Sequence, residues 1–151
     1  MTMPSRPVRD LMDRTLFNLD FVKRQARENG PYEFTQLLNS CLAVICHPWE
    51  KIRDEVENWD WIQAKACGWE PLPLARPSDK TPSSFYDELR QLRNGLAHGN
   101  LELYSGSNGQ IHGVHIWNEL KGTRTWGTML TAKELEQVLR CFHKIATQEI
   151  K

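Results

Sequence analysis

The sequence has no excess of charge of either sign. Its 151 residues include 19 lysines and arginines and 19 aspartates and glutamates, so the formal net charge at pH 7 is zero. A neutral chain is not drawn as a whole to nucleic acid or to an acidic membrane, and any nucleic-acid contact has to be local. With 40% hydrophobic residues, the chain fits one compact domain spanning residues 1–151.

Long apolar segments are also missing. No run approaches the roughly 20 apolar residues that a membrane-spanning helix requires. Residues 1–9 are polar and contain proline, unlike a secretion signal. These features predict a soluble cytoplasmic protein that has no membrane partner.

The chain has few cysteines and no Cys-x2-Cys pair. The four are Cys41, Cys46, Cys67 and Cys141. Most lie in apolar or helical patterns, which is typical of reduced packing residues. A zinc site would require His47 with Cys46, or His112 with His115, to meet distant partners in the fold. We therefore expect neither a metal nor another cofactor.

Periodic apolar residues predict a mainly α protein. Helices are expected at about 10–28, 32–46, 83–98 and 131–149, and a β-hairpin at about 101–117. The second helix is apolar on nearly every side, which is typical of a helix in the middle of a bundle. The order predicts an up-and-down bundle of four to five helices with the hairpin inserted before the last helix.

Local signals mark the ends of these elements. Ser83 or Ser84 offers an N-cap for the third long helix, and Thr131 with Glu134 makes a capping box for the last one. The Asn-Gly pair at 108–109 is a strong turn signal inside the hairpin. Residues 124–129 are a candidate third strand, and the proline-rich segment 68–82 predicts a loop.

The run Arg93-Asn94-Gly95-Leu96-Ala97-His98 carries the clearest chemistry in the chain. Arginine binds phosphate through a fixed cation, and histidine exchanges protons near neutral pH. Asn94 shares a helix ridge with His98 and is a candidate to orient the imidazole or the substrate. Arg90 lies on the same ridge as Arg93 and is a second candidate for this role. We therefore place the candidate active site here.

The spacing of the motif predicts a shared site. Residues five positions apart point about 140° away from each other on a straight helix, so Arg93 and His98 do not converge in its middle. Gly99 allows the last turn to unwind. Two copies across a two-fold axis would bring two arginines and two histidines into one cleft, which predicts a composite site in a homodimer.

Arg93, Asn94 and His98 also match the Arg-x4–6-His motif, with a polar residue after the arginine, of ribonucleases in the HEPN superfamily (higher eukaryotes and prokaryotes nucleotide-binding). From about Leu11 to Ile150 the chain resembles single-domain HEPN proteins of plasmid-borne and host-defence genes. In those proteins a similar phrase precedes a hairpin that contains a tryptophan and a closing helix.

The resemblance implies a toxin- or defence-type endoribonuclease that works without a metal. The 2′-hydroxyl of RNA would attack the adjacent phosphorus and leave a 2′,3′-cyclic phosphate and a 5′-hydroxyl. In such a site His98 is the general base or acid, Arg93 holds the phosphate, and Asn94 positions either group. The implied partners are RNA, a second copy of the chain, and an antitoxin or another defence-system protein.

One position departs from the family pattern. Toxin members paired with a nucleotidyltransferase antitoxin carry a tyrosine two residues after the histidine, and that tyrosine is the modification site. This chain has Asn100 there, and Tyr104 is the nearest tyrosine downstream. The resemblance therefore does not imply that kind of control.

Plainer roles for the same residues stay open. Arg93 could pair with Glu88 or Glu102, and the charge of His98 could complement the helix dipole. The chain would then be a non-catalytic RNA-binding or protein-interaction module. A third alternative is a structural dimer subunit that uses Trp117 and Trp126 as interface anchors. The remaining histidines, His47 included, are not expected to be catalytic.

Overall fold

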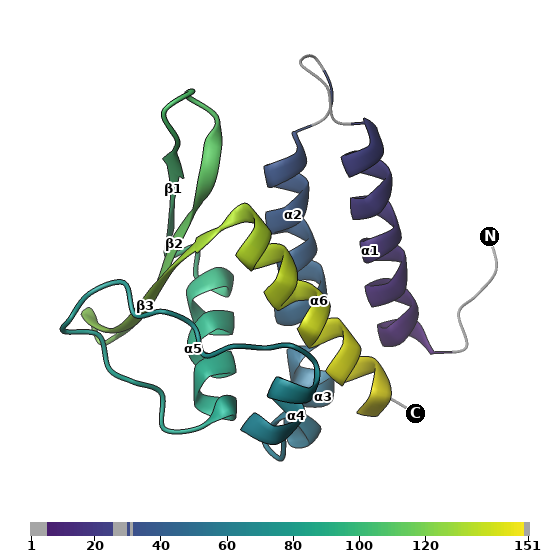
Figure 1. Cartoon of the computed structure of the whole chain (residues 1–151). Coiled ribbons are helices and arrows are strands. Elements are labelled where there is room, and N and C mark those ends of the chain that lie inside the picture. The colour runs from purple at the N-terminus through teal and green to yellow at the C-terminus, as the bar shows by residue number, and fades with distance from the viewer. Residues whose placement is uncertain (1–5, 26–29, 31, 150–151) are drawn as a thin grey trace.

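The computed structural model describes residues 6–25, 30 and 32–149, and these form a mainly helical protein with one antiparallel sheet (Figure 1). The helices are α1 (Pro7–Gln25), α2 (Glu33–Cys41), the π-helix η1 (Leu42–Cys46), α3 (Trp49–Val56), α4 (Trp61–Ala66), α5 (Phe85–Ala97) and α6 (Ala132–Glu149). The helix expected at about 10–28 corresponds to α1, and positions 26–28 lie outside the described residues. None of the described helices is long and apolar enough to span a membrane.

The sheet contains one strand more than the expected hairpin. Strands β1 (Leu101–Ser105), β2 (Ile111–Leu120) and β3 (Thr123–Thr131) pair antiparallel in the order β1-β2-β3. The candidate strand at 124–129 is therefore confirmed as part of β3. Figure 1 shows the sheet beside α5, whereas α1 and α2 run side by side and α6 crosses in front of α2.

The predicted caps form where the sequence placed them. Ser84 is the N-cap of α5, and its hydroxyl accepts a hydrogen bond from the backbone N–H of Asp87. At the start of α6, the side chains and backbone N–H groups of Thr131 and Glu134 exchange hydrogen bonds of 2.8 and 3.2 Å. Each cap satisfies donors that a helix start leaves unpaired.

The end of α5 is equally well defined. Gly99 has φ +70°, a conformation that glycine adopts without strain. Its N–H donates to the carbonyl of Leu96, and the N–H of Asn100 donates to the carbonyl of Gly95. This pair of bonds is a Schellman motif with Gly99 just after the helix. The chain turns there and enters β1.

Most of the large apolar side chains share one core between the helices and the sheet. Its largest fully buried members are Trp69, Trp126, Phe85, Phe142, Met12, Leu19, Ile45, Leu89, Leu92, Ile116, Leu130 and Leu135. Because Trp126 is completely buried, it does not anchor an interface, and this part of the structural-subunit alternative is wrong. Trp59 is buried in the core, and Trp61 packs against the core from its edge.

The segment between α4 and α5 follows an ordered path over the core. The buried carboxylate of Glu88 accepts hydrogen bonds from the Trp69 indole at 2.9 Å and from the Leu72 N–H at 2.8 Å. Burial raises the pKa of Glu88, against the effect of these two donors. Further along, Leu74 bridges to Thr128 of β3. The loop thus connects α5 to the outer edge of the sheet.

An ion pair closes the far end of the same loop. The Arg124 guanidinium donates to both oxygens of Asp79, at 2.7 and 2.8 Å, and a third nitrogen lies 2.9 Å from Nε2 of His115. Arginine only donates, so Nε2 of His115 is the acceptor. Burial and the Arg124 charge lower the pKa of His115, and the Arg124 hydrogen bonds outweigh burial to lower the pKa of Asp79.

We expect acidification to weaken this cluster. The folded state takes up a proton on His115 less readily than the unfolded chain, so stability is lost as pH falls below the ordinary histidine value of 6.5. His115→Gln keeps an acceptor for Arg124 but cannot titrate. Thermal unfolding between about pH 7 and 5 should show a smaller loss of stability for this variant. His112→Gln, at an exposed hairpin position, is the control, and an unchanged slope in His115→Gln would contradict the assignment.

The packing of α5 on the sheet depends on Gly95, a residue that has no side chain. A Cβ atom added to Gly95 would lie 2.7 Å from both Cγ2 of Ile116 and the carbonyl oxygen of Trp117. These distances are shorter than any ordinary contact, so Gly95 allows the α5 backbone to lie directly on β2.

Gly95→Ala should therefore destabilise the fold by about 1–3 kcal/mol, because the helix or the strand has to shift. Helix propensity alone predicts the opposite sign, a gain of about 1 kcal/mol. Urea unfolding distinguishes the two, with Ala97→Gly as a control for propensity at an exposed position of the same helix. A Gly95→Ala protein as stable as the parent would show that the contact is not required.

Candidate active site

The Arg93–His98 run occupies the last turns of α5 and its C-cap. Arg93 and Asn94 lie inside the helix, whereas His98 is the first residue after it, with φ −87° and ψ −3°. The Schellman turn at Gly99 ends the helix without bringing His98 back toward Arg93. The two side chains therefore leave α5 in different directions, as the helix geometry predicts.

Arg93 is held on one side of α5 with little neutralising charge nearby. One guanidinium nitrogen donates to the side-chain oxygen of Asn94 at 3.0 Å, and another lies 3.7 Å from a carboxylate oxygen of Glu50. The Glu50 side chain is 72% exposed, so solvent weakens that pair. Among the described residues the ion pair of Arg93 is with Glu50, and not with the alternative partners Glu88 or Glu102. Glu88 instead accepts hydrogen bonds from Trp69 and Leu72.

The Arg93 side chain is nevertheless well positioned. Only 23% of it is exposed, and its guanidinium carbon lies 5.9 Å from the ring centre of Trp49. Its Nε is buried and has no hydrogen-bond partner among the described residues. A guanidinium that is held in place and is paired only with an exposed carboxylate 3.7 Å away is suited to binding an anion.

His98 is exposed and free to meet a ligand. Its backbone N–H donates to the carbonyl of Asn94, whereas its imidazole has no hydrogen-bond partner in the described part of the chain. Asn94 was a candidate to orient either this imidazole or the substrate, and its side-chain oxygen accepts a hydrogen bond from Arg93. Within one protomer, the structure therefore brings Asn94 to Arg93 and leaves His98 apart.

Arg90 has a counter-ion of its own. Its guanidinium donates to Asp87 at 2.8 Å on the surface of α5. Burial acts to raise the pKa of Asp87, but hydrogen bonds from Arg90 and Ser83 outweigh it and hold the pKa below its usual value. The Arg90 charge is thus partly neutralised, which makes Arg90 a weaker candidate than Arg93 for phosphate.

Arg93 lines a broad groove of about 670 Å³ that lies between α1, α2, η1 and α5. Its lining residues are Leu11, Asn39, Leu42, Ala43, Cys46, His47, Arg93 and Ala97. The Cys46 thiol donates to the carbonyl of Arg93 at 3.6 Å, which joins η1 to α5. Burial raises the pKa of Cys46 to about 11, so this thiol stays protonated near neutral pH.

His47 is the groove residue that sequence reasoning missed. Nothing in the sequence predicted a catalytic role for it, but the structure places it in the lining of the groove with Arg93. Its position depends on the π-helical turn of η1, where the N–H of His47 donates to the carbonyl of Leu42 at 2.9 Å. No residue pattern in this segment predicts a π-helical turn, so the sequence does not indicate that His47 lines the groove.

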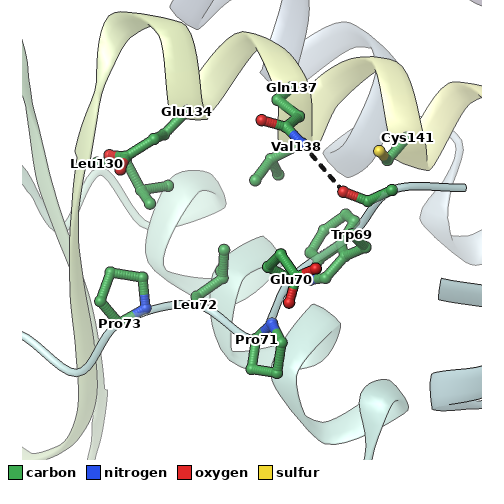
Figure 2. Close-up of a pocket in the computed structure, with 11 residues that line it drawn as sticks. Trp69, Glu70, Pro71, Leu72, Pro73, Leu130, Glu134, Gln137, Val138 and Cys141 are labelled. Atoms are coloured by element: carbon green, nitrogen blue, oxygen red, sulfur yellow. Dashed lines mark hydrogen bonds between the residues drawn. The ribbon is translucent and has the colours of Figure 1, made fainter. Parts of the chain in front are cut away.

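A second pocket lies on the other side of the core, between residues 68–73, β3 and α6 (Figure 2). It measures about 250 Å³ and is largely apolar, with Trp69, Leu72 and Val138 in its lining. The Gln137 amide donates to the carbonyl of Gly68 at 3.0 Å across one side, as Figure 2 shows. None of the candidate motif residues lines this pocket.

The described residues contain no group of three or more histidine, cysteine, aspartate or glutamate side chains that could hold a metal ion. The four cysteines are all free thiols. The polar side chains that line the groove are those of Arg93, His47, Cys46 and Asn39.

Comparison with known proteins gives one match. A search of curated proteins and a search of solved structures each found nothing similar to the chain. The model of one protein family, described as HEPN pEK499 p136, matches residues 1–151. Because that match covers the full sequence, the chain belongs to this HEPN family.

Proposed function

We propose that the protein is a metal-independent endoribonuclease that cleaves RNA at the site formed by Arg93 and His98. The observation that carries the proposal is the position of Arg93, whose guanidinium is held by Asn94 beside the Trp49 ring and lines a groove of about 670 Å³. Such a group suits a phosphate of an RNA backbone. Membership of a HEPN family supports an RNA-related role.

The chemistry is an internal transesterification. The 2′-oxygen of a ribose forms a bond to the adjacent phosphorus, and the bond from phosphorus to the 5′-oxygen of the next nucleotide breaks. A base takes the proton of the 2′-hydroxyl, and an acid gives a proton to the departing 5′-oxygen. The products are a 2′,3′-cyclic phosphate and a 5′-hydroxyl, and DNA is excluded because it lacks the nucleophile.

Each residue has a role in that step. Arg93 would bind the phosphate and stabilise the negative charge that grows on its oxygens. Asn94 fixes the guanidinium through their 3.0 Å hydrogen bond, so it acts as a positioning residue. His98, exposed at the end of α5, would transfer a proton as general base or acid.

A homodimer would complete this arrangement. In one protomer Arg93 faces the groove, and His98 is not among the groove residues. A second copy related by a two-fold axis can place its His98 against the Arg93 of the first, and the reverse contact then follows by symmetry. We therefore propose a composite site in which each phosphate meets residues of both protomers.

We also propose a toxin- or defence-type role in the cytoplasm, restrained by a partner protein. Asn100 stands where related toxins carry the tyrosine that their partner modifies. A restraining partner would therefore bind the protein or its site without using that modification.

Arg93→Ala should lower kcat/KM for a model RNA by about 100-fold or more, because it removes the main stabiliser of the phosphate charge. Cleavage is measured in excess chelator, and cyclic-phosphate ends are assayed directly. Arg76→Ala, which removes an exposed arginine from the loop, is the matched control and should cleave normally. Cleavage by Arg93→Ala at the parental rate would contradict the assignment of Arg93 to the ribonuclease site.

The alternative, a non-catalytic RNA-binding module, makes a different prediction for the same protein. Arg93 would then hold RNA without cleaving it, and Arg93→Ala would weaken binding with no product to lose. Binding of RNA without any cyclic-phosphate product, from a pure and folded sample, would favour this alternative.

Co-expression of Arg93→Ala and His98→Ala chains tests the composite site. If each site combines Arg93 of one protomer with His98 of the other, every mixed dimer keeps one intact site. Statistical pairing makes about half of the dimers mixed, so activity should return to about a quarter of the parental value. Inactive mixtures, or a monomer by light scattering, would rule out sharing between protomers.

A further inference from the structure

The groove that Arg93 lines also contains an imidazole ring, that of His47. His47 is exposed and lines this groove, whereas Arg93 enters it from α5. The two elements are in direct contact through the Cys46 thiol and the carbonyl of Arg93. A phosphate bound to Arg93 would therefore lie in the same hollow as the His47 imidazole.

The π-helical turn explains why His47 is found there. The bond from the N–H of His47 to the carbonyl of Leu42 spans five residues instead of the four of an α-helix. One extra residue in a turn rotates every following position by about 100° relative to an uninterrupted α-helix. Turns of this kind are rare and occur frequently at functional sites.

The groove around the His47 ring contains few other charged or titratable groups. Arg93 and Cys46 are the other charged or titratable groups in the lining, and Glu50 approaches Arg93 from α3. From α1 the groove receives Leu11, an apolar residue. The Asn39 amide, from α2, adds a polar group that can orient a sugar or a phosphate.

We propose that His47 is a further catalytic residue, one of two histidines that move protons during RNA cleavage. This inference rests on the proposed function. The reaction needs one neutral ring to accept the proton of the 2′-hydroxyl and one protonated ring to give a proton to the 5′-oxygen. His47 performs one of these transfers beside Arg93, and His98 performs the other.

The test is the pH dependence of cleavage of a short RNA by the 151-residue chain in excess chelator. The parent should show a bell-shaped profile of kcat/KM, because one ring has to be neutral and the other protonated. His47→Ala should lower kcat by about 100-fold, with little change in KM, and should lose one limb of the profile. His98→Ala should lose the other limb.

Three further measurements separate catalysis from structure. Added imidazole should restore part of the activity of His47→Ala, because a free ring can replace the missing proton carrier. His112→Ala, at an exposed hairpin position, should keep the parental rate and profile. Circular dichroism should show an unchanged fold in His47→Ala, since the side chain it removes is exposed.

The outcomes distinguish this inference from the proposal on which it rests. If the parent cleaves and Arg93→Ala does not, but His47→Ala keeps both limbs and the parental rate, His47 is not catalytic and the ribonuclease assignment stands. A loss of rate in His47→Ala that imidazole does not restore, with both limbs intact, also overturns the inference. A parent that produces no cyclic phosphate overturns both proposals.

Discussion

The contact between the backbone of α5 and strand β2 at Gly95 determines the geometry of the site. It fixes the distance of the helix from the sheet, because a side chain there would collide with Ile116 and Trp117. With Gly95 toward the sheet and Leu92 and Leu96 toward the core, Arg93 has to face η1. The same contact leaves His98 at the surface. One absent methyl group therefore decides which surface each motif residue reaches.

The chemistry of the groove depends on the positive charge of Arg93, which its neighbours neutralise only in part. The molecule pairs its charges well elsewhere, as in the Arg124–Asp79 ion pair, where both guanidinium hydrogen bonds are short. Arg93 instead has an amide, an aromatic face and a distant exposed carboxylate. The ion pair of Arg93 is thus weaker than that of Arg124, which leaves more of the Arg93 charge available to a ligand.

Local signals in the sequence predicted the elements better than they predicted the site. The caps at Ser84 and Thr131 depend on residues three positions away, so the sequence alone identifies them. The motif at the end of α5 could also be located. The π-turn that brings His47 into the groove depends on packing between η1 and α5, which no local pattern records. The burial of Trp126 likewise depends on the whole core.

The loop before α5 has a consequence for self-association. Its residues cover the outer edge of β3, through the bridge from Leu74 to Thr128 and hydrogen bonds from the N–H groups of Ala75 and Lys80. An open strand edge invites another chain to extend the sheet, and this protein covers that edge with its own backbone. A second copy is therefore kept from extending the sheet at β3, and β1 is the edge strand that this loop does not cover.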